Sequence, residues 1–199
     1  NTSAMALVAD VHTASPRVTQ RNQQGSKLQK LKWDTAQPLL YALDDNAKLY
    51  RIDPEQGLTR TYDRDMSGFI AYDVMDGHVR ALLVGGNIRH YSPELERIFA
   101  KAGPSQAQTI HVSQDQSALL VLSGSRCATS SALSSTPCKA SLLDATTLSP
   151  LQDENALPVE ADEVLGVIKT STGFALLEHE AGELVLGLID IDQGGTVTY

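Results

Sequence analysis

The stretch Ala118-Leu119-Leu120-Val121-Leu122 is an unbroken apolar run in a chain of 199 residues. A continuous apolar run of this length, bordered by turn residues, is typical of a β-strand that is buried on both faces. Three more runs of the same kind occur along the chain, at Leu39–Leu43, Ala81–Val84 and Phe174–Leu177. Their recurrence indicates a structural unit that is used four times.

Each apolar run is followed by a turn, a strand that alternates in polarity, a second turn and a third, weaker strand. In the first unit, Leu49–Ile52 alternates, and the segment Asp53-Pro54-Glu55-Gln56-Gly57 then turns the chain into Leu58–Tyr62. Proline presets φ and glycine accepts a positive φ, so this segment suits a β-turn. A repeat of roughly 40 residues built from strands and turns is typical of propeller blades. The sequence therefore predicts an all-β fold, a β-propeller-like array of about four four-stranded blades.

The predicted array occupies residues 29–199, and residues 1–28 are predicted to form a basic arm or linker. Segment 94–102 has apolar residues at helical spacing, but the repeat favours a strand there. In the third unit, we expect a fourth strand near Leu148. An array of four blades can belong to a longer protein, form half of a dimeric ring or be completed by a partner chain. The sequence leaves these three alternatives open.

The net charge of −8 disfavours a general nucleic-acid binder, because neutralising phosphates requires a basic face. The charge is unevenly distributed along the chain. Before Asp34, the acid Asp10 is outnumbered by basic residues, and the acids gather later in the chain. These basic residues are Arg17, Arg21, Lys27, Lys30 and Lys32. They are interpreted either as a solvated tail or as an arm that docks on an acidic partner.

Cys127 and Cys138 flank a polar segment that is rich in serine and threonine. A disulfide between them would join the ends of this segment and stabilise the fold by roughly 2–3 kcal/mol. The sequence therefore predicts a disulfide and, with it, an extracytoplasmic (periplasmic or secreted) location. The alternative is a cytosolic protein with two free thiols. The longest apolar runs are much shorter than the roughly 20 residues that a membrane-spanning helix needs, so no membrane span is predicted.

The segment Lys48–Gly57 and its counterpart Lys139–Thr147 resemble a hairpin of the β-propeller repeat superfamily, which includes YVTN-type, WD40-like and quinoprotein-like blades. In this hairpin a strand ends at an Asp, two or three turn residues and a Gly or Thr follow, and the next strand begins. The resemblance covers roughly residues 30–199 and implies a propeller fold. The tryptophan-docking motif of quinone-binding propellers is missing, because Trp33 is the only tryptophan. No cofactor is predicted.

The sequence contains no arrangement that is specific to an enzyme or a metal centre. The five histidines are scattered singly, and Gly-x-Ser-x-Gly is absent. A binding site of a propeller is expected on its inner strands and on the loops at one mouth, where aromatic and arginine side chains supply much of the binding energy. The candidates for such a site are Trp33, Tyr72, Arg89, His90, Tyr91 and His111.

The sequence favours a non-enzymatic, protein-binding scaffold module of an extracytoplasmic assembly. It would bind a protein partner or associate with itself through its blade edges, its loops or the basic arm. The main alternative is a periplasmic or secreted propeller enzyme, a hydrolase or an oxidoreductase, with its site spread across blades. A sugar-binding propeller is a third alternative, but the blades do not repeat an aromatic position.

Overall fold

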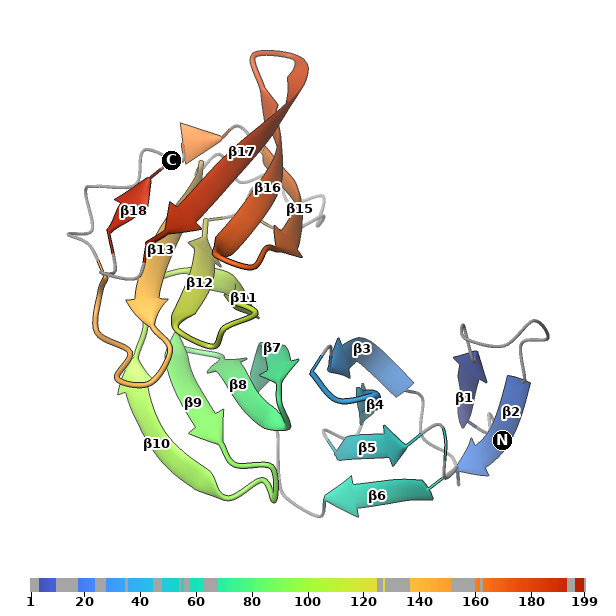
Figure 1. Ribbon diagram of the computed structural model, residues 1–199. Coiled ribbons are helices and arrows are strands. Elements are labelled where there is room, and N and C mark those ends of the chain that lie inside the picture. Colours follow the sequence, from blue (N-terminus) through green and yellow to red (C-terminus); the bar gives the residue numbers. More distant parts are fainter. Residues whose placement is uncertain are drawn as a thin grey trace. The chain divides into compact units, whose positions relative to one another are not determined.

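The chain folds into antiparallel sheets that form two compact units, Asn1–Phe69 and Ile70–Tyr199. Figure 1 shows the computed structural model, in which all regular elements of the described residues are strands. The described residues are 4–9, 18–23, 28–34, 36–44, 48–53, 55, 58–62, 68–124, 127, 137–151, 160–161, 163–192 and 196–198.

The first unit contains a two-stranded hairpin and a four-stranded sheet. The hairpin pairs β1 (Ala4–Ala9) with β2 (Val18–Gln23), and both strands lie within the predicted arm. The sheet consists of β3 (Leu28–Asp34), β4 (Leu39–Asp44), β5 (Leu49–Asp53) and β6 (Leu58–Tyr62), each paired with the next along the chain.

The apolar run of β4 is buried, as its sequence predicts. Tyr41 and Ala42 are neighbours in the chain and point to opposite faces of the sheet, and both are inaccessible to solvent. Ala42 packs with Tyr50 and Ile52 of β5 in one cluster. Both faces of this strand are therefore covered.

The second unit contains three four-stranded sheets, and in each the strand order follows the chain order. Their strands are β7 (Phe69–Met75), β8 (His78–Leu83), β9 (Asn87–Tyr91) and β10 (Arg97–Ala102); β11 (Ala107–Val112), β12 (Ala118–Ser123), β13 (Cys138–Asp144) and β14 (Glu160–Ala161); and β15 (Glu163–Lys169), β16 (Gly173–Glu180), β17 (Glu183–Ile191) and β18 (Val197–Thr198). The described residues of the two units thus form four four-stranded sheets, which confirms the predicted all-β, blade-like architecture.

The middle sheet, β11–β14, packs against both other sheets of this unit (Figure 1). On one side, Leu119 and Val121 join Leu82 of β8 in a buried cluster. On the other side, Leu120 and Leu122 join Phe174 of β16 in a second cluster, together with other residues. Successive side chains of β12 thus enter different cores. This explains why its sequence is apolar at every position.

Two hairpins use the turn chemistry that the sequence indicates. Asp76 and Gly77, between β7 and β8, both have positive φ, at 50° and 77°. Ala181 and Gly182, between β16 and β17, have φ of 49° and 91°. Two consecutive positive φ values are typical of the type I′ turn, whose twist matches that of antiparallel strands.

The structure confirms one local prediction and corrects another. Segment 94–102 ends in strand β10 and not in a helix. The prediction of a strand near Leu148 is wrong, because the chain turns there. The carboxylate of Asp144 accepts hydrogen bonds from the backbone N–H groups of Thr146 and Thr147, at 3.0 and 2.6 Å, and Leu148 has a positive φ. The fourth strand of this sheet is instead β14.

Candidate protein-interaction surface

The candidate binding residues occupy different environments. Trp33, on β3, is 44% exposed, whereas Tyr72 of β7 is buried. On β9, Arg89 donates a hydrogen bond from Nη1 to the hydroxyl oxygen of buried Tyr91, at 3.4 Å. His90 lies between them in the chain and therefore points to the opposite face of the sheet. The structure brings Arg89 and Tyr91 together. His111 lies half-buried on β11.

His90 lies in a cluster with His78, Arg80 and Phe99 in the second unit. Its Nε2 lies 3.0 Å from Nδ1 of His78, and its ring packs nearly perpendicular to that of Phe99, with the ring centroids 5.1 Å apart. Arg80 pairs with His90 across β8 and β9 and donates a hydrogen bond to the carbonyl oxygen of Ala145, at 3.2 Å. Burial, with the charges of Arg80 and His78, lowers the pKa of His90 to about 3. Such a histidine is a weak general base at neutral pH.

Burial also changes the pKa values of Arg80 and Tyr72. Burial lowers the pKa of Arg80 to about 10, so the guanidinium remains charged at neutral pH. Burial and, to a lesser extent, the neighbouring Asp73 raise the pKa of the Tyr72 hydroxyl, which therefore stays protonated. Neither group is poised to transfer a proton near pH 7. Among the described residues, no group of three or more His, Cys, Asp or Glu side chains is placed to hold a metal ion.

An ion pair connects the first strands of the three sheets in the second unit. Buried Asp73, on β7, accepts a hydrogen bond from the backbone N–H of Val112, on β11, at 2.7 Å. The same carboxylate oxygen lies 2.8 Å from Nζ of Lys169, on β15. Its second oxygen accepts from the N–H of Val74, at 3.0 Å. With its charge paired and its oxygens bonded, this carboxylate has a structural role.

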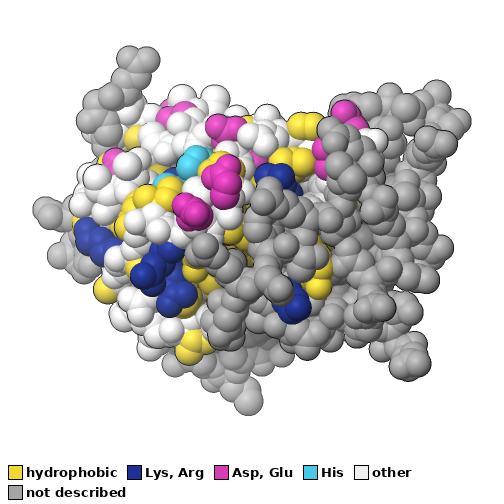
Figure 2. All heavy atoms as spheres, turned by 90° about the horizontal axis from the view of Figure 1, so that it is seen from below, with side chains coloured by type: hydrophobic (Ala, Val, Ile, Leu, Met, Phe, Trp, Pro, Cys, Tyr) yellow, Lys and Arg dark blue, Asp and Glu magenta, His cyan; other side chains and the backbone are white. Residues whose placement is uncertain are grey.

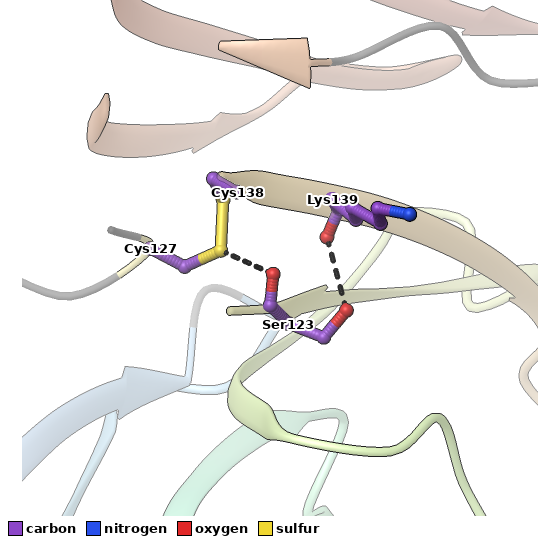
Figure 3. The surroundings of a disulfide bond; sticks show 4 residues. All are labelled: Ser123, Cys127, Cys138 and Lys139. Carbon is purple, nitrogen blue, oxygen red and sulfur yellow. Dashed lines mark hydrogen bonds between the residues drawn. A yellow bond between two sulfur atoms is a disulfide. The ribbon is translucent and has the colours of Figure 1, made fainter. Parts of the chain in front are cut away.

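The predicted disulfide joins Cys127 and Cys138, whose Cα atoms lie 4.9 Å apart (Figure 3). The Cys127 sulfur lies 2.9 Å from the carbonyl oxygen of Ser123, and both cysteines are buried. Their side chains also contribute to the core between β11–β14 and β15–β18. The disulfide therefore anchors the chain after β12 to the start of β13. Residues 128–136, between the two cysteines, lie outside the described part of the chain.

The most distinctive surface of the second unit is an apolar face on the last sheet. Side chains that are paired directly across antiparallel strands share a face of the sheet. Leu177 pairs with Leu186, His179 with Leu184, and Ala175 with both Ile168 and Leu188. Exposed apolar side chains therefore lie together on one face, which we call the open face: Ile168, Leu177, Leu184, Leu186 and Leu188.

The preceding sheet has an equivalent face, and there it is covered. By strand pairing, Leu122 of β12 corresponds to Leu177, and Leu142 of β13 corresponds to Leu188. Leu122 and Leu142 are 1% and 3% exposed because the β15–β18 sheet packs on them. Leu177 and Leu188 are 40% and 56% exposed. The open face is thus built like a surface between two sheets. Contiguous exposed apolar patches mark interaction sites in soluble proteins.

The last sheet is rich in acidic side chains. Residues 163–192 contain one basic side chain, Lys169, and several carboxylates. The carboxylates are Glu163, Glu178, Glu180, Glu183, Asp190 and Asp192. All except buried Glu178 are exposed or half-exposed. On the side of the molecule shown in Figure 2, by contrast, acidic, basic and hydrophobic side chains are mixed over the described residues. The last sheet therefore combines an apolar face with a net negative charge. By strand alternation, Asp190 lies on the same face as Leu188, whereas Glu180 and Glu183 lie on the opposite face.

Comparison with solved structures confirms the fold. A chain in the crystal structure of a mitotic checkpoint complex is 14% identical, with a TM-score of 0.61, and the match covers 88% of this chain and 53% of that one. The N-terminal domain of Nup159 is 14% identical, with a TM-score of 0.56. The match covers 94% of this chain and 56% of that one. A chain in the structure of S. cerevisiae Dbp5 bound to Nup159, Gle1, IP6 and ADP is 14% identical, with a TM-score of 0.53. That match covers 87% of this chain and 52% of the other one.

The chain spans about half the length of the solved structures that it resembles. No family model matches the sequence, and no curated protein does. Among the described residues, we find no helix that is long and apolar enough to cross a membrane.

Proposed function

We propose that this chain is a non-enzymatic, protein-binding scaffold of an extracytoplasmic assembly. The open face is the observation that carries this proposal, because it exposes five large apolar side chains on one side of a sheet. Burying a leucine or isoleucine is worth about 1.5–3 kcal/mol, so covering this face supplies substantial binding energy. Two of the similar structures are complexes of several proteins, by their titles, which supports a role in assembly.

The chemistry of the buried polar groups supports a non-enzymatic role. His90 has its pKa lowered to about 3 and is held against Phe99 and His78, so it suits packing better than proton transfer. Asp73 is saturated by its contacts with Lys169 and two backbone N–H groups. The groups that bind a partner are therefore sought on the surface. Trp33, with 44% of its side chain exposed, is a further candidate contact in the first unit.

The disulfide supports an oxidising compartment. Disulfides persist outside the cytoplasm and are reduced inside it. Here both cysteines are buried in the core of the second unit, so the bond is part of the packed structure. Trapping the cellular protein with acid and alkylating its thiols tests this compartment. We expect both cysteines to be oxidised in the cell, and a majority of free thiols would contradict an extracytoplasmic location.

Site-specific crosslinking in the producing cells tests the binding role. A photo-crosslinking amino acid at Leu186, in the centre of the open face, is expected to form adducts with protein. The matched control is Val84, in the turn after β8, which is also apolar and is 73% exposed, but stands outside the open face. Adducts at position 186 and none at position 84 support the proposal. Absence of adducts at position 186 contradicts it.

A further inference from the structure

We propose that the second unit binds a small oxyanion, of the size of phosphate, between the β7–β10 sheet and the turn that follows β13. The site is separate from the open face, and the inference does not depend on the proposed function. Its central residue is Arg80, a buried arginine that forms no ion pair in the described part of the chain.

Basic side chains gather on one face of the β7–β10 sheet. Arg80 and His90 pair directly across β8 and β9, so they share a face. His78 precedes Arg80 by two residues and lies on the same face. Lys101 of β10 pairs with Ile88, which precedes His90 by two residues, and so joins this face as well. This face thus presents an arginine, a lysine and two histidines to the neighbouring sheet.

Arg80 is buried, yet much of its hydrogen-bonding capacity is unused. The residue is 4% exposed, and its Nε donates to the carbonyl oxygen of Ala145. The N–H groups on Nη1 and Nη2 have no partner among the described residues. Arginine is rarely buried without a partner, because an unpaired buried charge is costly. An oxyanion supplies this partner, since the planar guanidinium can bond two oxygens of a phosphate at once.

His90 offers a further donor beside Arg80. Its Nδ1 is buried and has no hydrogen-bond partner in the structure. The pKa of about 3 keeps the ring neutral at pH 7, so its Nε2 can accept a hydrogen bond from Nδ1–H of His78. In that tautomer the proton of His90 lies on Nδ1. The unpartnered nitrogen is then an N–H donor, which suits an anion.

The turn after β13, residues 144–149, brings Arg80 and Lys101 to one place. Ala145 accepts from Arg80, and Oγ of Ser149 lies 3.4 Å from Nζ of Lys101. Asp144 carries the carboxylate of this turn, and its Oδ1 accepts hydrogen bonds from the turn's own N–H groups. Two cationic side chains therefore meet the same turn. Their charge suits the double negative charge of phosphate better than the single charge of a carboxylate.

The surrounding charges define the side from which the anion approaches. Asp76, Glu94 and Glu96 are exposed and belong to the two turns at the His78 end of the sheet. These carboxylates repel an anion at that end. Lys101 is exposed near the other end of the strands. The ligand therefore enters beside Lys101.

Titration calorimetry of the full chain with sodium phosphate, at pH 7.5 and constant ionic strength, tests the site. We expect one phosphate to bind per chain, and Arg80→Gln to bind it at least about tenfold more weakly, because charge-assisted hydrogen bonds are lost. The control is Arg97→Gln, which removes an exposed arginine that pairs with Tyr91 and so stands outside the basic face. No binding to the original protein, or equal weakening in both variants, would overturn the inference.

Lys101→Gln keeps the test valid if Arg80→Gln fails to fold. This side chain is exposed, so its replacement should leave the fold intact, which circular dichroism verifies. We expect it to weaken phosphate binding about threefold, as for an exposed charge pair. An affinity equal to that of Arg97→Gln would contradict the proposed site.

Thermal unfolding distinguishes a bound anion from a general salt effect. Phosphate stabilises folded proteins by exclusion from their surface, and this effect should be equal in all variants. Binding adds a further rise in Tm that only a protein with the site shows. The rise should therefore be larger in the original protein and in Arg97→Gln than in Arg80→Gln or Lys101→Gln. Equal rises in all four proteins would overturn the inference.

A phosphate ester distinguishes free phosphate from a phosphorylated ligand. Because Arg80 and His90 are buried, phenyl phosphate should bind more weakly than inorganic phosphate. Equal or tighter binding of the ester would contradict an enclosed site for a free anion.

Discussion

Asp73 connects three strands from different sheets through a single carboxylate. Its oxygens contact the N–H groups of Val74 and Val112 and the ammonium group of Lys169. Each of these partners would be left without its bond if the carboxylate were removed. Losing one partner of a buried ion pair is costly because the remaining charge stays buried. The stability of the second unit therefore depends strongly on this residue.

We expect Asp73→Ala to lower the free energy of unfolding by about 3 kcal/mol. The control is the double variant Asp73→Ala with Lys169→Met, which removes the stranded charge and should lose less stability than the single variant. Urea denaturation followed by circular dichroism measures all three proteins. A single variant within about 0.5 kcal/mol of the original protein would contradict the structural role of this ion pair.

His90 makes stability depend on pH. Its pKa is lowered from 6.5 to about 3 by burial and by the charges of Arg80 and His78. The unfolded chain therefore binds a proton at this position below about pH 6.5, whereas the folded protein does not. Stability is full above this pH and falls as the pH drops towards 3, by at most about 1.4 kcal/mol per pH unit from this residue.

Replacing the imidazole tests this dependence. When the pH falls from 7.5 to 5, His90 should lower the free energy of unfolding by about 2 kcal/mol. The variant His90→Gln cannot take up that proton, so its stability should fall less over the same interval. Urea midpoints measured at both pH values give the difference. Equal losses in the two proteins would contradict the assignment of His90 as a buried neutral group.

At the scale of the element, the β16–β17 hairpin depends on a close approach of two backbones. Gly173 begins β16 and pairs with Asp190 of β17. A Cβ atom at Gly173 would lie 2.0 Å from the carbonyl oxygen of Ile189, whereas one at Gly166, on β15, would meet no atom within 4 Å. The two glycines lie in the same sheet, but only one of them is required by its surroundings.

Gly173→Ala is therefore expected to destabilise the protein by about 2 kcal/mol, because the two strands must separate to admit the methyl group. Gly166→Ala provides the control and should leave stability unchanged or slightly higher, since glycine weakens a strand. Thermal unfolding followed by circular dichroism compares the variants. Equal effects of the two substitutions would contradict the packing between β16 and β17.

The sequence predicts the strands well because their patterns are local. Apolar runs identify β4, β8, β12 and β16, and turn residues such as Asp76-Gly77 identify the hairpins between strands. The same patterns do not reveal what covers a strand. Phe174–Leu177 is as apolar as Ala118–Leu122, yet Leu177 is exposed and Leu122 is buried. The sequence therefore does not reveal the open face, since its exposure depends on packing between sheets and not on its own residues.

The candidate binding residues show the limit of local patterns at a site. The sequence predicts Tyr72 and Tyr91 as candidates for a binding site on inner strands and mouth loops, and both are buried in the structure. Which face of a strand is covered depends on sheet packing, and period-two alternation alone does not define it. Asp73 and Lys169 lie in different sheets, so no sequence spacing indicated their ion pair. Only the repeated apolar residues at alternate positions of β17 were a visible signal for the open face.

At the scale of the whole molecule, stacked sheets behave like a repeat protein. In the second unit, β11–β14 packs on a neighbouring sheet through each of its faces, whereas the described side chains of β15–β18 pack on β11–β14 through one face. Repeat proteins carry polar side chains on a sheet or helix face that meets solvent. The open face instead presents Leu184, Leu186 and Leu188. Covering this face would remove apolar side chains from water and so stabilise the array.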